Sequence, residues 1–276
     1  MNAAHDVSAL RQMLAGLEAV HLPGASSSFS LGAAGPDSVL AGTLARGVLH
    51  EVYAAEGADI PAACGFALAL ALRASHAQGE ARPIVWIRQD FLESEAGRLD
   101  AHGLSGFGLD PARLILVRTH DPEQALRAAG DAVRCPALGA VLLEPWGEPK
   151  VLDLTATRRL ALRSGVSGVT LFLIRVAARP SPSVAATRWR VRPAISIPLA
   201  ADAPGAPAFA AELLRHRGGL QGHAWSLEWN HDNRSFRDIA PLSRAVVPVP
   251  AGQPARPGAA AHGPAPADVR PLQRAG

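Results

Sequence analysis

Short apolar segments that alternate with amphipathic helical segments constrain the fold of this chain most. The apolar segments are IVWI (84–87), LILV (114–117), AVLLE (140–144) and VTLFLIRV (169–176). The helical patterns between them lie around residues 93–102, 121–134 and 155–164. Strands that are apolar on both faces and separated by helices are typical of a parallel sheet covered by helices on both faces. The sequence therefore predicts an α/β fold.

The segment 44–72 adds a strand, a loop and an apolar helix, the order in which a phosphate-binding loop is built. A working loop carries G-x-x-x-x-G-K-[ST], because the lysine reaches the outer phosphates and the hydroxyl group holds Mg²⁺. Between Ala54 and Cys64 there is one glycine, Gly57, and the only lysine of the chain is Lys150. We therefore expect a degenerate phosphate loop around Gly57, no cofactor, no metal ion and no catalytic residue.

Changes in composition divide the chain into four parts. Residues 1–22 are predicted to form an amphipathic helical arm, and the Gly/Ser/Pro-rich residues 23–40 a flexible linker. Residues 41–244 form the α/β domain. Residues 245–276 are rich in Pro, Ala and Gly without periodicity, which predicts a disordered tail.

The predicted arm carries an apolar stripe on one helical face. Its members are the candidate partner contacts Val7, Leu10, Leu14, Leu17 and Val20. Such a stripe either packs into the core of its own domain or fills a groove on a partner. The flexible linker favours the second use, so we expect the arm to contact a partner.

Composition bounds the location of the protein. The hydrophobic content of 48% with 18% charged residues is typical of a globular chain. The longest apolar run, 60–72, is shorter than the roughly 20 residues that span a bilayer. Cys64 and Cys135 lack the spacing of a zinc site or a disulfide framework. We expect a cytoplasmic protein without a membrane partner.

Basic charge is concentrated in the second part of the chain, because residues 1–150 carry a net charge of −6 and residues 151–276 carry +9. In the segment Arg188-Trp189-Arg190-Val191-Arg192, residues alternate with period two, which directs the arginines to solvent and Trp189 to the core.

Two interpretations of these arginines stay open. They form an ordinary solvated strand, or they track the phosphates of single-stranded DNA together with Arg158 and Arg159 of a predicted helix. Arg188, Arg190, Arg192, Arg158 and Arg159 are the candidate nucleic-acid contacts. We expect such binding to be weak.

The order of elements resembles the core of the RecA recombinase family. The strand 44–52 is similar to the strand that enters the family's phosphate loop, and AVLLE (140–144) lies where the family has its Walker B strand. Asp90 falls where the family has its catalytic glutamate. Without lysine and Mg²⁺, we expect Asp90 and Glu144 to be structural carboxylates held by backbone N–H groups or arginine.

The last segments resemble the family's final hairpin. TRWRV (187–191), AFAAELLRHR (208–217) and HAWSLEWN (223–230) have no helix between them. The resemblance therefore implies a RecA-like core, mainly parallel and covered by helices on both faces, with an antiparallel extension at one edge of the sheet.

A more specific resemblance is to the ImuA family, RecA-like accessory proteins of a bacterial mutagenic DNA-repair cassette. The motifs that carry it are GVLHEV (47–52), GFALALALR (65–73), LDLTATRRLALRSGVSG (152–168), SVAATRWRV (183–191) and ELLRHRGG (212–219). The resemblance implies a non-catalytic accessory factor in SOS-induced translesion DNA synthesis. It also implies contacts with ImuB, an error-prone C-family DNA polymerase or RecA, and association with the nucleoid after DNA damage.

Two alternatives stay open at this point. The first is a RecA-like DNA-binding ATPase, which the missing lysine argues against. The second is a cell-division inhibitor similar to SulA, to which the ImuA family is related. The arginine-rich strand favours a protein that works close to DNA over this second alternative.

Overall fold

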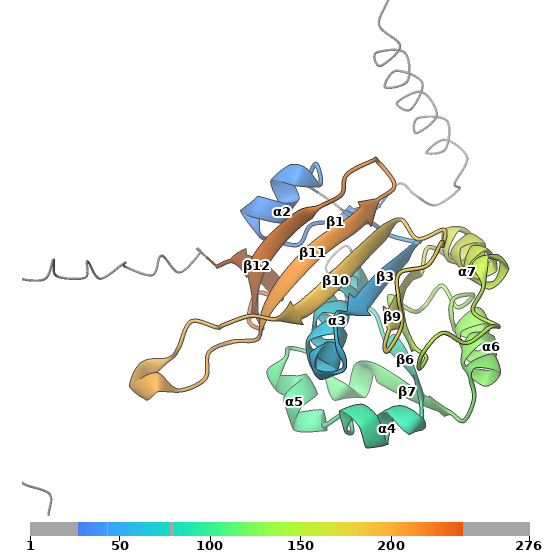
Figure 1. The fold of residues 1–276 in the computed structure, drawn as a ribbon, viewed down its shortest axis with the longest axis horizontal. Coiled ribbons are helices and arrows are strands. Elements are labelled where there is room, and N and C mark those ends of the chain that lie inside the picture. Colours follow the sequence, from blue (N-terminus) through green and yellow to red (C-terminus); the bar gives the residue numbers. More distant parts are fainter. Residues whose placement is uncertain (1–26, 43, 78–79, 240–276) are drawn as a thin grey trace, which may run out of the picture. The chain divides into compact units, whose positions relative to one another are not determined.

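The computed structural model describes residues 27–239 apart from residue 43 and residues 78–79 (Figure 1). Its main sheet has nine strands. They are β3 (Leu49–Ala54), β6 (Ile84–Gln89), β7 (Leu114–Thr119), β8 (Ala140–Glu144), β9 (Thr170–Arg175), β10 (Thr187–Pro193), β11 (Ala208–His216), β12 (His223–Asn230) and β13 (Ser235–Asp238). Their order across the sheet is β13-β12-β11-β10-β3-β9-β8-β6-β7.

Strand direction divides this sheet into two parts. Neighbours from β7 to β10 pair in parallel, and β10, β11, β12 and β13 pair antiparallel. β10 therefore belongs to both parts, since it is parallel to β3 and antiparallel to β11. The α/β fold predicted for a RecA-like core, with an antiparallel extension at one edge, is confirmed.

Helices cover both faces of the parallel part (Figure 1). They are α3 (Ile60–Ser75), α4 (Phe91–Ala96), α5 (Ala101–Gly106), α6 (Pro122–Ala132) and α7 (Leu154–Ser167). A further helix, α2 (Ala34–Val39), lies against β13 of the antiparallel part. Two small sheets pair β1 (Ser28–Phe29) with β2 (Leu44–Ala45) and β4 (His76–Ala77) with β5 (Glu80–Ala81). Single 3₁₀ turns lie at Gly57–Asp59, Pro111–Arg113 and Ala200–Asp202.

The central helix α3 is buried on one face of the sheet, where Phe66 packs against Trp189 and Phe209. Helix and 3₁₀ turn together, Gly57–Ser75, are long and apolar enough by composition to cross a membrane, but 67% of the apolar window is buried inside the protein. A helix that is apolar all round is typical of a core element, and this burial accounts for its composition.

On the opposite face, α6 and α7 pack side by side over β6, β8 and β9. Both begin with an aspartate cap: Asp121 accepts a hydrogen bond from the N–H of Gln124, and Asp153 from that of Ala156, each at 2.7 Å. Such caps satisfy N–H groups that have no partner in the first turn. They explain why these helices begin where the sequence pattern predicts.

Residues 27–40 correct one predicted boundary, because this part of the expected flexible linker 23–40 is folded. Phe29 and Leu31 are buried in the core, and the carboxylate of Asp37 accepts N–H groups of Leu31 and Gly32 at 2.8 and 2.9 Å. Gly32 makes the bend before α2 at a φ of +90°, a conformation that favours glycine. The prediction of a linker is therefore wrong for these residues.

The remaining predicted parts fall at the ends of the chain. The arm 1–22 with its stripe, residues 23–26 and the tail 245–276 lie outside the described residues. Their predictions are untested by this structure.

Candidate functional site

The loop that takes the place of a phosphate loop joins β3 to α3 through residues 55–59. Two acidic residues cap it reciprocally: the carboxylate of Asp59 accepts the N–H of Glu56 at 3.0 Å, and the side chain of Glu56 accepts the N–H of Asp59. A phosphate would need these N–H groups and a positive neighbour. The loop offers negative charge instead, so it does not fit the phosphates of a nucleotide.

The buried carboxylate of Glu144 lies at the carboxyl end of β8 and contacts three other side chains. Its oxygens accept the Trp86 indole N–H at 2.9 Å and the Cys64 thiol at 3.3 Å, and the Arg88 Nε lies 3.1 Å away. Burial raises the pKa of Glu144, and the charge of Arg88 opposes that rise. Burial and the nearby Glu144 raise the pKa of Cys64 well above its usual value.

Arg88 also ties the end of β6 to the segment that follows. Its terminal nitrogens donate to the carbonyl oxygens of Gly97 at 2.7 Å and Leu92 at 3.4 Å. The positive charge that compensates Glu144 therefore belongs to a side chain that is held by the carboxylate and by two backbone carbonyl groups. These residues do not fit a magnesium–nucleotide complex, and the expectation that arginine holds Glu144 agrees with the geometry.

A cavity of about 260 Å³ lies beside this cluster, between α3 and the segment containing α4 and α5. Its walls are mainly apolar and include Pro61, Leu68, Leu99, Leu104 and Phe107. Cys64, Trp86 and Arg88 also line it, so the cavity borders the three side chains that surround the carboxylate of Glu144.

Asp90 forms a separate, more exposed group. Its carboxylate lies 3.1 Å from Arg118 Nε and 2.6 Å from His120 Nδ1, and Arg118 also reaches Glu93 at 3.3 Å. Among the described residues, Asp90 and Glu144 share no hydrogen-bond or ion-pair partner. The two acids therefore belong to separate polar groups, each paired with its own arginine.

The arginine-rich strand β10 differs from its prediction at its first arginine. Trp189 is fully buried, as predicted, but Arg188 is also largely covered. Its Nε lies 2.9 Å from Glu51 Oε2, and its terminal nitrogen donates to the Ser183 hydroxyl at 3.0 Å and to the Ser181 carbonyl at 2.5 Å. The prediction that Arg188 faces solvent is wrong, because it binds Glu51 and the loop 177–186; its predicted contact with nucleic acid stays a prediction.

Arg188 belongs to a buried polar cluster that the sequence analysis missed. The Tyr53 ring lies between the guanidinium groups of Arg175 and Arg188, at 5.7 and 5.8 Å from its centroid, and its hydroxyl lies 3.4 Å from Glu51. Burial raises the pKa of Tyr53. The cluster anchors the loop after β9 through the hydrogen bonds of Arg188 to Ser181 and Ser183.

The alternation of Glu51 and Tyr53 in β3 was the available signal for this cluster, since both side chains fall on the face that Arg188 shares. The alternation alone does not identify Arg188 as the partner of Glu51, because the two residues meet only through the pairing of β3 with β10, which are far apart in the sequence.

The other candidate arginines are accessible but separate. Arg190 pairs with Glu212 at 3.1 Å on the neighbouring strand, and Arg192 is exposed toward the strand end. Arg158 and Arg159 are exposed on α7, where Arg158 lines a small hollow together with Arg217. The structure thus leaves four of the five predicted nucleic-acid contacts at the surface without placing them in one cluster.

Comparison with known proteins gives the family. No family model matches the chain. Two curated proteins called Protein ImuA, from Caulobacter vibrioides strains NA1000 / CB15N and ATCC 19089 / CIP 103742 / CB 15, are each 33% identical over 216 residues, which is 73% of this chain and 84% of theirs. Among solved structures, the crystal structure of the RadB recombinase aligns with a TM-score of 0.48 and 15% identity, over 77% of this chain and 100% of that one. By its similarity to the curated relatives, this chain belongs to the ImuA family.

Proposed function

We propose that this chain is a non-catalytic accessory factor in SOS-induced translesion DNA synthesis. It acts through protein contacts with ImuB, an error-prone C-family DNA polymerase or RecA. Membership of the ImuA family supports a role in the mutagenic DNA-damage cassette. The observation that carries the non-catalytic part is the closed cluster in which Arg88, Trp86 and Cys64 surround Glu144.

Phosphoryl transfer needs a metal ion and a lysine that neutralise charge on the phosphates, and a residue that orients the nucleophile. Here the carboxylate of Glu144 is already paired with an arginine, and Glu56 and Asp59 occupy the start of α3. Both features oppose the binding of a phosphate chain. A RecA-like body with this site keeps its shape without a nucleotide and presents its surfaces continuously.

Direct contact with DNA has a smaller part in the proposal. The exposed Arg192, Arg158 and Arg159, with the half-buried Arg190 that is paired with Glu212, supply positive charge for weak, non-specific binding to a phosphate backbone. The loop 177–186 is held by the cluster around Arg188. It is therefore poorly suited to insert between the bases of single-stranded DNA, and we assign recruitment mainly to protein contacts.

Affinity purification of the full chain from DNA-damaged cells tests the proposal. We expect ImuB, the error-prone polymerase or RecA to co-purify, and the amounts should not change when ATP is depleted. Recovery of the tubulin-like division protein alone would favour the cell-division alternative. ATP turnover by the purified chain that disappears in Glu144→Gln would contradict the non-catalytic assignment.

A further inference from the structure

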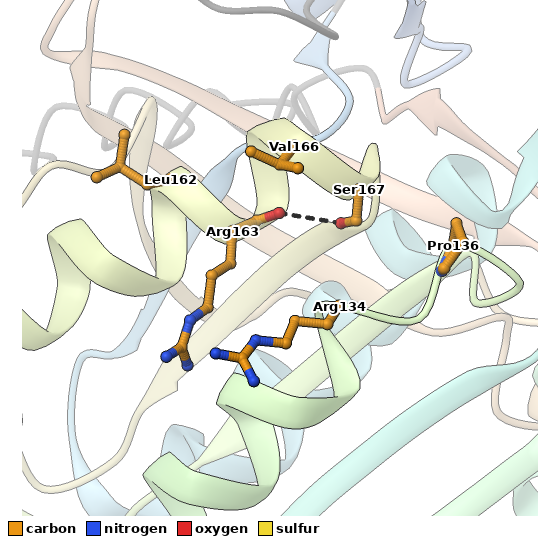
Figure 2. Close-up of a pocket in the computed structure, with 6 residues that line it drawn as sticks. All are labelled: Arg134, Pro136, Leu162, Arg163, Val166 and Ser167. Carbon is orange, nitrogen blue, oxygen red and sulfur yellow. Dashed lines mark hydrogen bonds between the residues drawn. The ribbon is translucent and has the colours of Figure 1, made fainter.

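The outer surface of α7 carries two exposed aliphatic side chains one helical turn apart. Leu162 is 55% exposed and Val166 is 84% exposed. Beside them is a hollow of about 460 Å³ between α7 and the end of α6, lined by Arg134, Pro136, Leu162, Arg163, Val166 and Ser167 (Figure 2). A second hollow, of about 140 Å³, lies on the other flank of Leu162. We call the surface formed by Leu162, Val166 and the lining of the two hollows the α7 face.

Arginines border the α7 face. Figure 2 shows Arg134 and Arg163 directed toward one another at the mouth of the larger hollow. Arg134 has a loose pair with Asp131 at 3.7 Å, whereas Arg158 and Arg163 form no ion pair with any residue that the structure describes. An apolar strip with a basic border is complementary to an apolar stripe that has acidic residues near it.

The described chain begins beside this face. The N–H of Arg46 donates to the Ser27 carbonyl at 2.9 Å, and the adjacent Gly47 lies against the end of α7. A Cβ atom on Gly47 would stand 3.3 Å from the Ser164 carbonyl oxygen and 3.2 Å from the Gly168 Cα. Ser27, the first described residue, therefore lies near the last turn of α7, where Val166 is exposed.

We propose that the N-terminal segment 6–20 of the same chain docks on the α7 face. As a helix, its stripe from Val7 to Val20 would be about 20 Å long, which matches the 14-residue α7. The connection 21–26 can extend over about 20 Å, enough to return the segment along α7. Asp6 and Glu18 supply acidic groups near the two ends of the stripe, opposite the arginine border.

This docking extends the proposed function, because the stripe expected to contact a partner is covered in the free protein. A partner would then have to displace it from the α7 face, so partner binding and arm release are coupled. The inference concerns the free chain alone. Its test needs no partner, and it can fail while the proposed function stands.

The exposed Cys135 provides a natural probe, since its two neighbours in sequence, Arg134 and Pro136, line the larger hollow, while Cys64 is buried. The experiment measures the rate at which iodoacetamide alkylates Cys135 in the full chain and in Leu14→Asp. Gln12→Asp, on the polar side of the predicted helix, is the matched control. If the segment is docked nine-tenths of the time, alkylation should be about tenfold faster in Leu14→Asp and unchanged in Gln12→Asp.

The α7 side is tested by Val166→Asp and by the double variant with Leu14→Asp. Each single change should release the segment, so the double variant should react no faster than either single one. Equal rates in the wild-type chain and Leu14→Asp, or equal acceleration by Gln12→Asp, would overturn the proposal. Protection of Cys135 that disappears on dilution would also overturn it, because a second copy would then supply the segment. Unreactive Cys64 in every variant verifies that the fold is intact.

Discussion

The Arg88 Nε lies 3.1 Å from a carboxylate oxygen of Glu144, and both side chains are buried. In a RecA-like site, an acidic residue at this strand end belongs to metal and nucleotide chemistry. Here its charge is already balanced inside the protein. The pair therefore explains why an acid at the Walker B position can persist as a structural residue.

The first prediction concerns nucleotide affinity. Titration of the full chain with labelled ATP and Mg²⁺ should show no saturation in the low-micromolar range, because the loop before α3 offers carboxylates where phosphates need cations. Glu144→Gln should leave the titration unchanged. Saturable binding that depends on Glu144 would contradict the structural role of this carboxylate.

The second prediction concerns the free energy of unfolding. Arg88→Met removes the cation beside Glu144 and should destabilise the protein by about 3–5 kcal/mol, as is typical when one partner of a buried ion pair is lost. Adding Glu144→Gln should recover part of this loss. Arg118→Ala breaks the exposed pairs with Asp90 and Glu93 and should change stability by less than about 1 kcal/mol. Urea denaturation of the wild type and these three variants measures the three changes in the free energy of unfolding.

The third prediction concerns pH. His50 is buried, with Nδ1 2.7 Å from the Thr187 hydroxyl and Nε2 2.9 Å from the Ala45 carbonyl. Burial lowers its pKa from 6.5 to about 4, an effect that the nearby His216 reinforces and the Ala45 hydrogen bond opposes. The unfolded chain therefore binds a proton that the folded chain rejects between pH 6.5 and 4. Stability from neutral His50 is complete above pH 6.5 and falls as pH decreases, by about 3 kcal/mol at pH 4.

His50→Asn provides the comparison, because it removes the titrating group while an amide can still bond to Thr187 or Ala45. The difference in unfolding free energy between wild type and variant should change with pH only below about 6.5. A difference that stays constant from pH 7 to 4.5 would show that His50 does not control acid sensitivity.

Much of the fold follows from local patterns. Period-two alternation placed Trp189 in the core, and the helical pattern of 121–134 predicted α6. Phe29 and Leu31 alternate with serines, which is a strand pattern and a signal for β1. The Gly/Ser/Pro-rich composition around them obscured this signal. Composition predicts a linker there, but the long-range contact of Gly35 with Asp238 requires the folded chain.

The site was harder to predict because its partners come from distant strands. Alternation assigns Arg188 to one face of β10, but it cannot show that Glu51 lies opposite or that the loop 177–186 covers both. Likewise, the pairing of Arg88 with Glu144 depends on the register between β6 and β8. A buried ion pair forms only when the strands pair in the folded chain. The local sequence around Arg88 or Glu144 therefore does not distinguish it from an arginine or glutamate at the surface.

The fourth prediction separates DNA contact from stability. Arg188→Gln leaves Glu51 buried without its cation and should destabilise the domain, so any loss of DNA binding would follow from unfolding. Arg192→Ala and the pair Arg158→Ala/Arg159→Ala should leave the melting temperature unchanged. If they contact single-stranded DNA, each lost phosphate contact should reduce the slope of log affinity against log salt by about 0.7. Fluorescence anisotropy at several salt concentrations measures this slope.

The last prediction concerns the N-terminal arm. Deletion of residues 1–22 should leave the melting temperature of the domain almost unchanged, because docking on an exposed strip around Leu162 and Val166 buries little apolar surface. The same deletion should reduce co-purification with a cassette partner or RecA, since the stripe from Val7 to Val20 supplies the contact. A core helix would behave in the opposite way, because its removal exposes a large apolar patch. Aggregation or a much lower melting temperature of the truncated chain would therefore assign the helix to the core and place the partner surface elsewhere.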